Sequence, residues 1–151
     1  MQLSQKERLL LEDLKSHEEM CIKKYTNYAN QAQDPQLKQM FQNHAQIEQE
    51  HYNTINQILS GQIPNVQQQG QGQQQQQVQG QQAGMSQQQD ADSCQDMLQT
   101  EKYVSGTYDT AIFEFKDPNI RQVLNHIQSE EQKHGEAIFA YMQSKGMYKV
   151  H

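Results

Sequence analysis

Residues 34–58 read DPQLKQMFQNHAQIEQEHYNTINQI, and residues 117–141 read DPNIRQVLNHIQSEEQKHGEAIFAY. The two stretches belong to a longer alignment of residues 11–59 with residues 94–142, which needs no gap and has an offset of 83 residues. Ten of its 49 positions are identical, and in the first copy they are Asp13, Glu18, Tyr25, Asp34, Pro35, Gln39, Glu48, Gln49, His51 and Ile55. An internal repeat of this length indicates that one structural unit occurs twice in the chain.

Each copy of the repeat has the pattern of a helical hairpin, because residues of one kind recur every three or four positions. The faces expected to be buried are positions 11, 14, 18, 21, 25, 28 and 32, then 37, 41, 44, 48, 51, 55 and 58, and in the last helix 120, 124, 127, 131, 134, 138 and 141. Asp-Pro at 34–35 and at 117–118 supplies an N-cap and a first helical residue, so a new helix is expected to begin there. Gly146 is expected to end the last helix.

These hairpins predict an all-α fold, an antiparallel four-helix bundle of the ferritin-like type. Residues 1–60 are expected to form the first hairpin and residues 91–151 the second, together making one domain. Residues 61–89 contain 16 glutamines and no charged residue, which predicts a disordered linker over residues 61–90, acting as a tether or in self-association. A long crossover between two short turns is the connectivity of ferritin-like bundles.

Composition excludes several classes of protein. A chain of 151 residues accommodates one domain, and its net charge of −6 gives no basic surface for nucleic acid. No apolar run approaches the roughly 18 residues that a membrane span needs, and the N-terminus lacks the apolar middle of a signal peptide. We therefore expect synthesis in the cytoplasm and no membrane partner. Cys21 and Cys94 match no zinc motif, and we expect reduced thiols rather than a disulfide.

Four glutamates and two histidines fall on the faces expected to be buried. Buried carboxylates are costly unless a cation balances them, and two divalent ions would balance four. Glu-x-x-His places a carboxylate and an imidazole one turn apart, while a glutamate from the first and third helices is expected to bridge or cap the ions. Such oxygen and nitrogen ligands suit Fe or Mn. The sequence therefore predicts two divalent metal ions, Fe or Mn, held by Glu18, Glu48, His51, Glu101, Glu131 and His134; a shifted, solvated face is the alternative.

Other polar residues near these positions have open roles. Tyr25 and Tyr108 lie two turns after Glu18 and Glu101, where each can support a ligand carboxylate, act in redox chemistry, or simply fill the core. His44, one turn before Glu48, is a candidate extra ligand or donor to a ligand. We expect solvated or outward-pointing side chains at His17, His126, His151, Glu19, Glu50 and Glu130.

The duplicated Glu…Glu-x-x-His pattern resembles the ferritin-like superfamily, rubrerythrins included. More narrowly, KERLLLEDLKSHEEMCIKKYTNYANQAQDPQLKQMFQ and HYNTINQIL in the first 60 residues resemble the spore coat protein F family of endospore-forming bacteria. The stretch from DMLQTEKYVSGTYDTAIFEFKDPNIRQ to GMYKV is similar to the C-terminal hairpin of the same family.

The resemblance implies a place in or around the spore coat, with other spore coat proteins or further copies of this chain (a homo-oligomer) as partners. One hypothesis is a coat protein whose metal site protects the spore by consuming peroxide or oxygen. A second is a purely structural coat component with a structural or vestigial metal site. A third is a manganese catalase-like or rubrerythrin-like peroxidase, although the CxxC pairs of a rubredoxin module do not occur in this chain.

Overall fold

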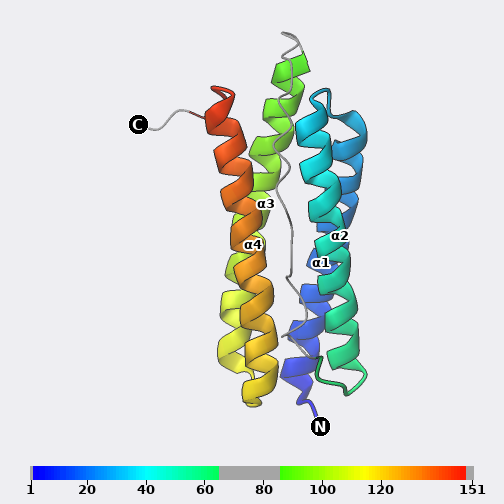
Figure 1. Cartoon of the computed structure of the whole chain (residues 1–151). Coiled ribbons are helices and arrows are strands. Elements are labelled where there is room, and N and C mark those ends of the chain that lie inside the picture. The colour runs from blue at the N-terminus through cyan, green and yellow to red at the C-terminus, as the bar shows by residue number, and fades with distance from the viewer. Residues whose placement is uncertain (1, 65–85, 149–151) are drawn as a thin grey trace.

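The computed structural model describes residues 2–64 and 86–148. These residues form four helices and, within the same ranges, no strand: α1 (Gln5–Gln31), α2 (Pro35–Leu59), α3 (Ser86–Glu114) and α4 (Pro118–Ser144). The helices lie side by side as a bundle (Figure 1). The predicted all-α four-helix bundle is therefore confirmed.

Two hairpins build the bundle, α1 with α2 and α3 with α4. Helix α3 also packs on α1, and α2 contacts α4. Since α3 begins at the end of the bundle where α1 finishes, these neighbours are antiparallel as well (Figure 1). This connectivity is compatible with the ferritin-like arrangement expected from the sequence. Most of the predicted linker, residues 65–85, lies outside the described residues.

The helix ends follow the expected capping chemistry. The Asp34 and Asp117 side chains accept hydrogen bonds from the backbone N–H groups of Gln36 and Asn119, and a proline follows each aspartate as the first helical residue. Gly146 follows the C-cap of α4 with a φ of +70°, a left-handed conformation that favours glycine. The predicted restarts and the predicted end of α4 are confirmed.

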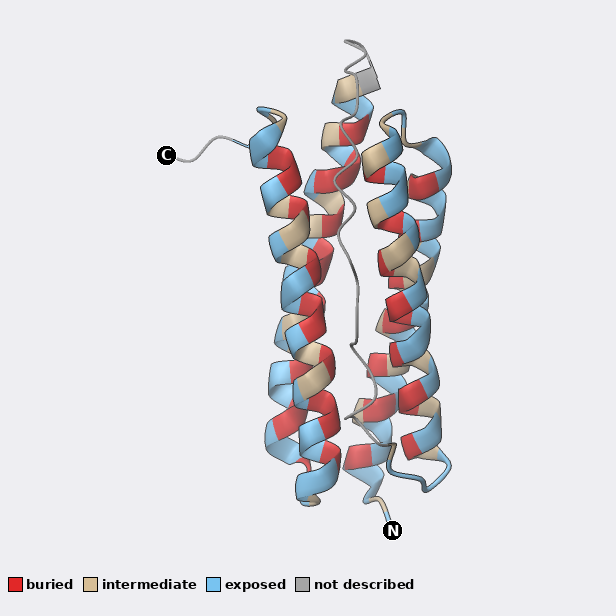
Figure 2. Ribbon diagram, viewed as in Figure 1, coloured by how far each residue is buried: buried red, intermediate tan, exposed pale blue. Residues whose placement is uncertain are grey.

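The buried faces are those that the repeat predicts. All seven predicted positions on α2 and all seven on α4 are buried, as are the first five on α1, whereas Tyr28 and Ala32 are half-buried. Figure 2 shows the buried residues along the inner sides of the helices. Cys21 and Cys94 are buried free thiols, as expected. Among the described residues, no helix combines the length and apolarity needed to cross a membrane.

Helix α3 begins earlier than the sequence predicts. Residues 86–90 were expected in the linker, but they form the first turn of α3, a correction that glutamine's good helix propensity explains. Asp90 in this turn is buried, and its carboxylate accepts hydrogen bonds from the N–H groups of Gln33 and Asp34, both at 3.1 Å. The start of α3 is thereby attached to the joint between α1 and α2.

Asp34 is expected to matter more for stability than its repeat counterpart Asp117. Asp34 caps α2 and also accepts a hydrogen bond from the Tyr141 hydroxyl of α4, whereas the hydrogen bond at the Asp117 side chain is the exposed one to its own helix. We expect Asp34→Ala to lower the free energy of unfolding by about 2–3 kcal/mol and Asp117→Ala by about 1 kcal/mol. Urea denaturation of both variants measures this, and equal losses would contradict the tie between the hairpins.

Candidate metal centre

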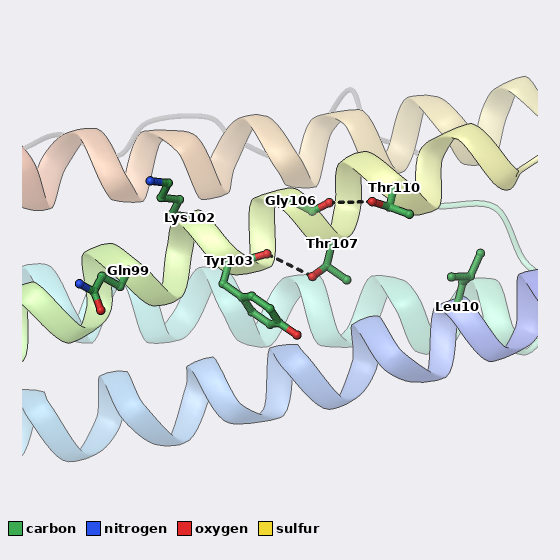
Figure 3. Close-up of a pocket in the computed structure, with 7 residues that line it drawn as sticks. All are labelled: Leu10, Gln99, Lys102, Tyr103, Gly106, Thr107 and Thr110. Carbon is green, nitrogen blue, oxygen red and sulfur yellow. Dashed lines mark hydrogen bonds between the residues drawn. The ribbon is translucent and has the colours of Figure 1, made fainter.

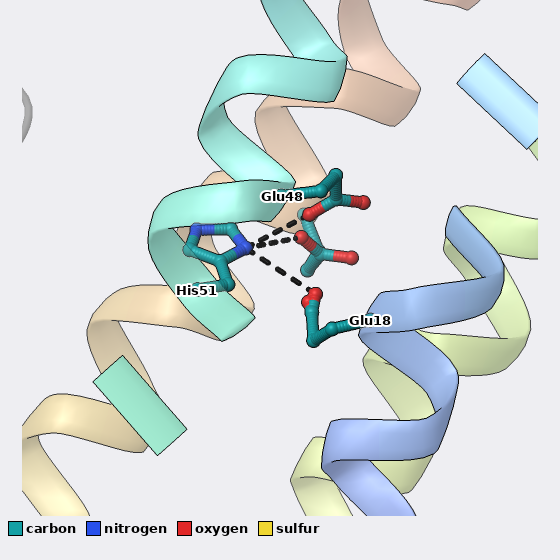
Figure 4. A group of neighbouring side chains, drawn as sticks. Glu18, Glu48 and His51 are labelled. Atoms are coloured by element: carbon teal, nitrogen blue, oxygen red, sulfur yellow. Dashed lines mark hydrogen bonds and ion pairs between the residues drawn. The ribbon is translucent and has the colours of Figure 1, made fainter. Parts of the chain in front are cut away.

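The six predicted ligand residues meet in the middle of the bundle. Apolar layers lie on both sides of them, with Leu11 and Leu14 before Glu18 on α1 and Tyr25 after it. All six residues are at most 3% exposed. They form two groups, each with its possible ligand atoms within 4.8 Å of one another: Glu18, Glu48, His51 and Glu131 in group 1, and Glu48, Glu101, Glu131 and His134 in group 2. Figure 4 shows Glu18, Glu48 and His51 of group 1 converging from α1 and α2.

Two carboxylates belong to both groups, Glu48 of α2 and Glu131 of α4. Glu18 of α1 and Glu101 of α3 belong to one group each. The sequence left open whether the glutamates of the first and third helices bridge or cap a pair of ions. The geometry favours the capping role for them, and it gives the shared role to the glutamates of the Glu-x-x-His motifs.

His51 is surrounded by carboxylate oxygens. Its Nδ1 lies 2.8 Å from Glu48 Oε1, 2.9 Å from Glu131 Oε1 and 3.5 Å from Glu18 Oε1. One ring nitrogen carries a single proton, so it cannot satisfy three acceptors. On the other side of the centre, His134 Nδ1 lies 3.1 Å from Glu101 Oε2.

The donor set fits two divalent cations. Among the described residues, six buried carboxylate oxygens of the centre have no hydrogen-bond donor, and they belong to Glu18, Glu48, Glu101 and Glu131. Buried polar atoms are normally satisfied, and unsatisfied carboxylate oxygens are especially costly. Two divalent ions would supply four positive charges for these four carboxylates, and oxygen and imidazole ligands suit Fe or Mn. That these residues bind metal stays a prediction at this point.

Without a cation the centre is electrostatically unfavourable. Burial raises the pKa of Glu18 and Glu48 above the ordinary range, and burial together with the charge of Glu131 raises the pKa of Glu101 to about 7. Burial opposes a charge on His51, but the carboxylates around it, Glu18 first, outweigh burial and raise its pKa. Without metal, these carboxyl groups and His51 therefore tend to keep their protons. A bound metal ion would take the place of those protons and supply the positive charge.

The three candidate supporting residues are all buried near the ligands. The Tyr25 hydroxyl donates a hydrogen bond to Glu101 Oε2, so this tyrosine holds a ligand carboxylate. The Tyr108 hydroxyl is buried without a partner among the described residues, and burial raises its pKa, which keeps it a neutral phenol. His44 stacks on His134 with ring centroids 4.0 Å apart. Burial, and then the charge of His134, lowers the pKa of His44.

Glu130 was expected to point away from the ligands, and this expectation is wrong. Its side chain is buried, and its Oε1 lies 2.8 Å from His51 Nε2. His126 was expected to be solvated, but it is half-buried, and its Nε2 lies 3.3 Å from the same Glu130 oxygen. Burial would raise the pKa of Glu130, but the hydrogen bond from His51 and the charges of the neighbouring histidines, His51 first, together outweigh burial and lower the pKa. Glu130 therefore contacts a ligand histidine as a carboxylate.

The remaining polar residues follow the prediction only in part. Glu19 and Glu50 are exposed as expected, whereas His17, like His126, is half-buried and packs edge-on against the exposed Tyr103. His151 lies outside the described residues.

A shallow groove follows the surface between α1 and α3 (Figure 3). No histidine, cysteine or carboxylate lines it, and the Thr107 and Thr110 hydroxyls are engaged by backbone carbonyls one turn earlier. The groove residues are Leu10, Gln99, Lys102, Tyr103, Gly106, Thr107 and Thr110. The candidate ligand residues therefore all lie in the buried centre, and none of them lines the groove.

Comparison with known proteins gives a family match for the second hairpin. Residues 89–151 match the family model of the Coat F domain, which supports the resemblance to the spore coat protein F family drawn from this half of the sequence. The resemblance of the first 60 residues to the same family stays a prediction. No curated protein and no solved structure matches the chain.

Proposed function

From the premise that residues 89–151 match the Coat F domain, we propose that this chain is a spore coat protein with a dinuclear metal centre in a ferritin-like bundle. The Coat F domain supports the coat assignment and a place among other coat proteins. The observation that carries the metal centre is the pair of overlapping buried groups with two shared glutamates. Fe or Mn is the metal that the ligand chemistry favours.

The chain's own residues have distinct roles in this proposal. Glu48 and Glu131 would hold both ions, and three of their buried carboxylate oxygens have no hydrogen-bond donor among the described residues. Tyr25 fixes the orientation of Glu101 through its hydroxyl hydrogen bond. The apolar layers above and below the centre exclude bulk water, which strengthens the interaction of each carboxylate with a cation.

Two divalent Fe or Mn ions, when bound, would together supply the two electrons that reduce one peroxide to two waters, and an external reductant or the oxidation of a second peroxide would have to return those electrons before the next turnover. The neutral Tyr108 hydroxyl is a buried hydrogen-bond donor without a partner among the described residues. We therefore propose protection against peroxide or oxygen as the activity of the loaded protein.

A structural role is the second candidate, and one observation favours it. Each group takes three residues from one hairpin and a shared glutamate from the other. Bound ions would therefore fasten the two hairpins together even without turnover.

The decisive experiment is anaerobic loading of the purified full chain with Fe²⁺ or Mn²⁺, removal of free metal, and elemental analysis. We expect two ions per chain and a higher melting temperature, because the ions bind only the folded state. Peroxide consumption by each loaded form, measured with and without an added reductant and against the metal-free protein as control, then separates the candidates. Two bound ions without peroxide turnover would favour the structural role, and the absence of any retained ion would refute the metal centre.

A further inference from the structure

The two ligand histidines differ in what their second ring nitrogen contacts. His51 Nε2 lies 2.8 Å from Glu130 Oε1, and this carboxylate comes from α4, the opposite hairpin. His134 Nε2 is buried and has no hydrogen-bond partner among the described residues. The internal repeat relates the two histidines, so the difference must come from positions where the copies diverge.

Two such divergences explain the difference. The repeat aligns Glu130 with Ile47, which is buried but has no acceptor for a histidine N–H. The repeat also aligns His44 with Ile127. The His44 imidazole covers His134, whereas the residue at the matching position of the other copy is an isoleucine. The His44 and His134 rings stack at 17° between planes, and stacked rings present their faces rather than their ring nitrogens.

A carboxylate behind a ligand histidine has two effects on metal binding. It accepts the proton of Nε2, which fixes the tautomer and turns the lone pair of Nδ1 toward the ion. It also makes the imidazole a stronger base and therefore a stronger ligand. In group 1, Nδ1 of His51 is the nitrogen that faces the glutamates. Glu130 therefore holds His51 in the form and orientation that binds metal.

We propose that Glu130 makes the two metal positions inequivalent, so that the position of group 1 fills first and holds its ion more tightly than the position of group 2. This inference rests on the proposed metal centre. Glu130 is a positioning residue here, because it acts through His51 and does not join either group of ligands. The position of group 2, with the unsupported His134, holds the more exchangeable ion.

Titration of the metal-free protein with Mn²⁺, followed by calorimetry and electron paramagnetic resonance, tests the proposal. We expect two steps whose affinities differ by about 10- to 100-fold, the range that such histidine partners contribute. Glu18→Gln should weaken the tight step and Glu101→Gln the weak one, which assigns the steps to the groups. At one equivalent, the spectrum should show single ions rather than coupled pairs.

Replacing Glu130 with the residue of the other copy is the sharpest variant. Glu130→Ile should weaken the tight step by about 10- to 100-fold and bring the two steps together. Glu130→Gln, which keeps the shape, should weaken it less. The reciprocal Ile47→Glu should strengthen the weak step. The control is Glu50→Gln, which removes the same charge beside His51 from an exposed position and should change neither step.

The outcomes separate this inference from the proposed function. If the wild-type protein binds no ion, the metal centre itself is refuted. If two ions bind with equal affinity, or if Glu130→Ile weakens both steps alike, the metal centre stands and the role of Glu130 is refuted. Circular dichroism of each variant establishes that the bundle is folded, and Glu130→Gln decides the matter should Glu130→Ile fail to fold.

Discussion

Replacing Glu48 and Glu131 together by glutamine is expected to abolish the binding of both metal ions. These are the two residues that belong to both groups, and the double change also halves the negative charge of the centre. Neutral amide oxygens are much weaker ligands for Fe or Mn than carboxylates. Elemental analysis after anaerobic loading should therefore fall from two ions per chain to nearly none, and the metal-dependent rise in melting temperature should vanish.

The same double variant is expected to be more stable than the wild type when no metal is present. It removes two crowded buried carboxylates, whose burial and mutual repulsion oppose folding when no cation balances them. Glu19→Gln/Glu50→Gln is the matched control, since both glutamates adjoin ligands but are exposed. Retention of two ions by the double variant, or unchanged metal-free stability, would show that Glu48 and Glu131 do not have the role assigned to them.

The metal-free protein should lose stability as the pH rises from 6.5 to 8, and the loaded protein should not. A carboxyl whose folded pKa exceeds its unfolded pKa binds more protons in the folded state, so its contribution falls as the pH rises between the two values. With its pKa near 7, Glu101 alone contributes a loss of about 1 kcal/mol over this range. Glu18, Glu48 and His51, whose pKa values are also raised, act in the same direction.

The loaded protein should behave in the opposite way, because metal ions must displace the protons of their ligands and so bind more tightly at higher pH. The lowered pKa of His44 has the opposite effect, because it makes the folded state more stable as the pH rises toward 6.5. The predicted loss of stability is therefore measured above pH 6.5. Urea midpoints measured in EDTA and in Mn²⁺ at several pH values test this. If the difference between the EDTA and Mn²⁺ midpoints were the same at every pH, protons and metal ions would not be competing for the same side chains.

Most of the fold was predictable because the repeat carries independent signals that agree. The three-and-four spacing, the two Asp-Pro restarts and Gly146 each indicate the same helices, and consistent local signals of this kind specify one fold. The start of α3 was not predictable from composition, since a glutamine-rich stretch is compatible with both linker and helix. What holds that start in place is a tertiary contact, the Asp90 carboxylate under the α1–α2 joint.

The six ligand positions could be found from sequence because they recur in both copies, but the role of Glu130 could not. Helical spacing turns Glu130 away from the face of its neighbour Glu131, and the repeat offers no second acidic residue at Ile47 to mark the position. Its side chain reaches His51 on α2 from the flank of α4, a contact between hairpins that needs their relative placement. The adjacent pair Glu130-Glu131 within a Glu-x-x-His motif was the one available signal.

The divergence between Glu130 and Ile47 also bears on the history of the molecule. If a single hairpin once paired with an identical copy of itself, symmetry would have given both histidines the same neighbour, either two glutamates or two isoleucines. Only after duplication and fusion into one chain could mutation change one side and spare the other. The unequal pair is therefore a mark of ancestry, a difference that no symmetric dimer of hairpins could have inherited.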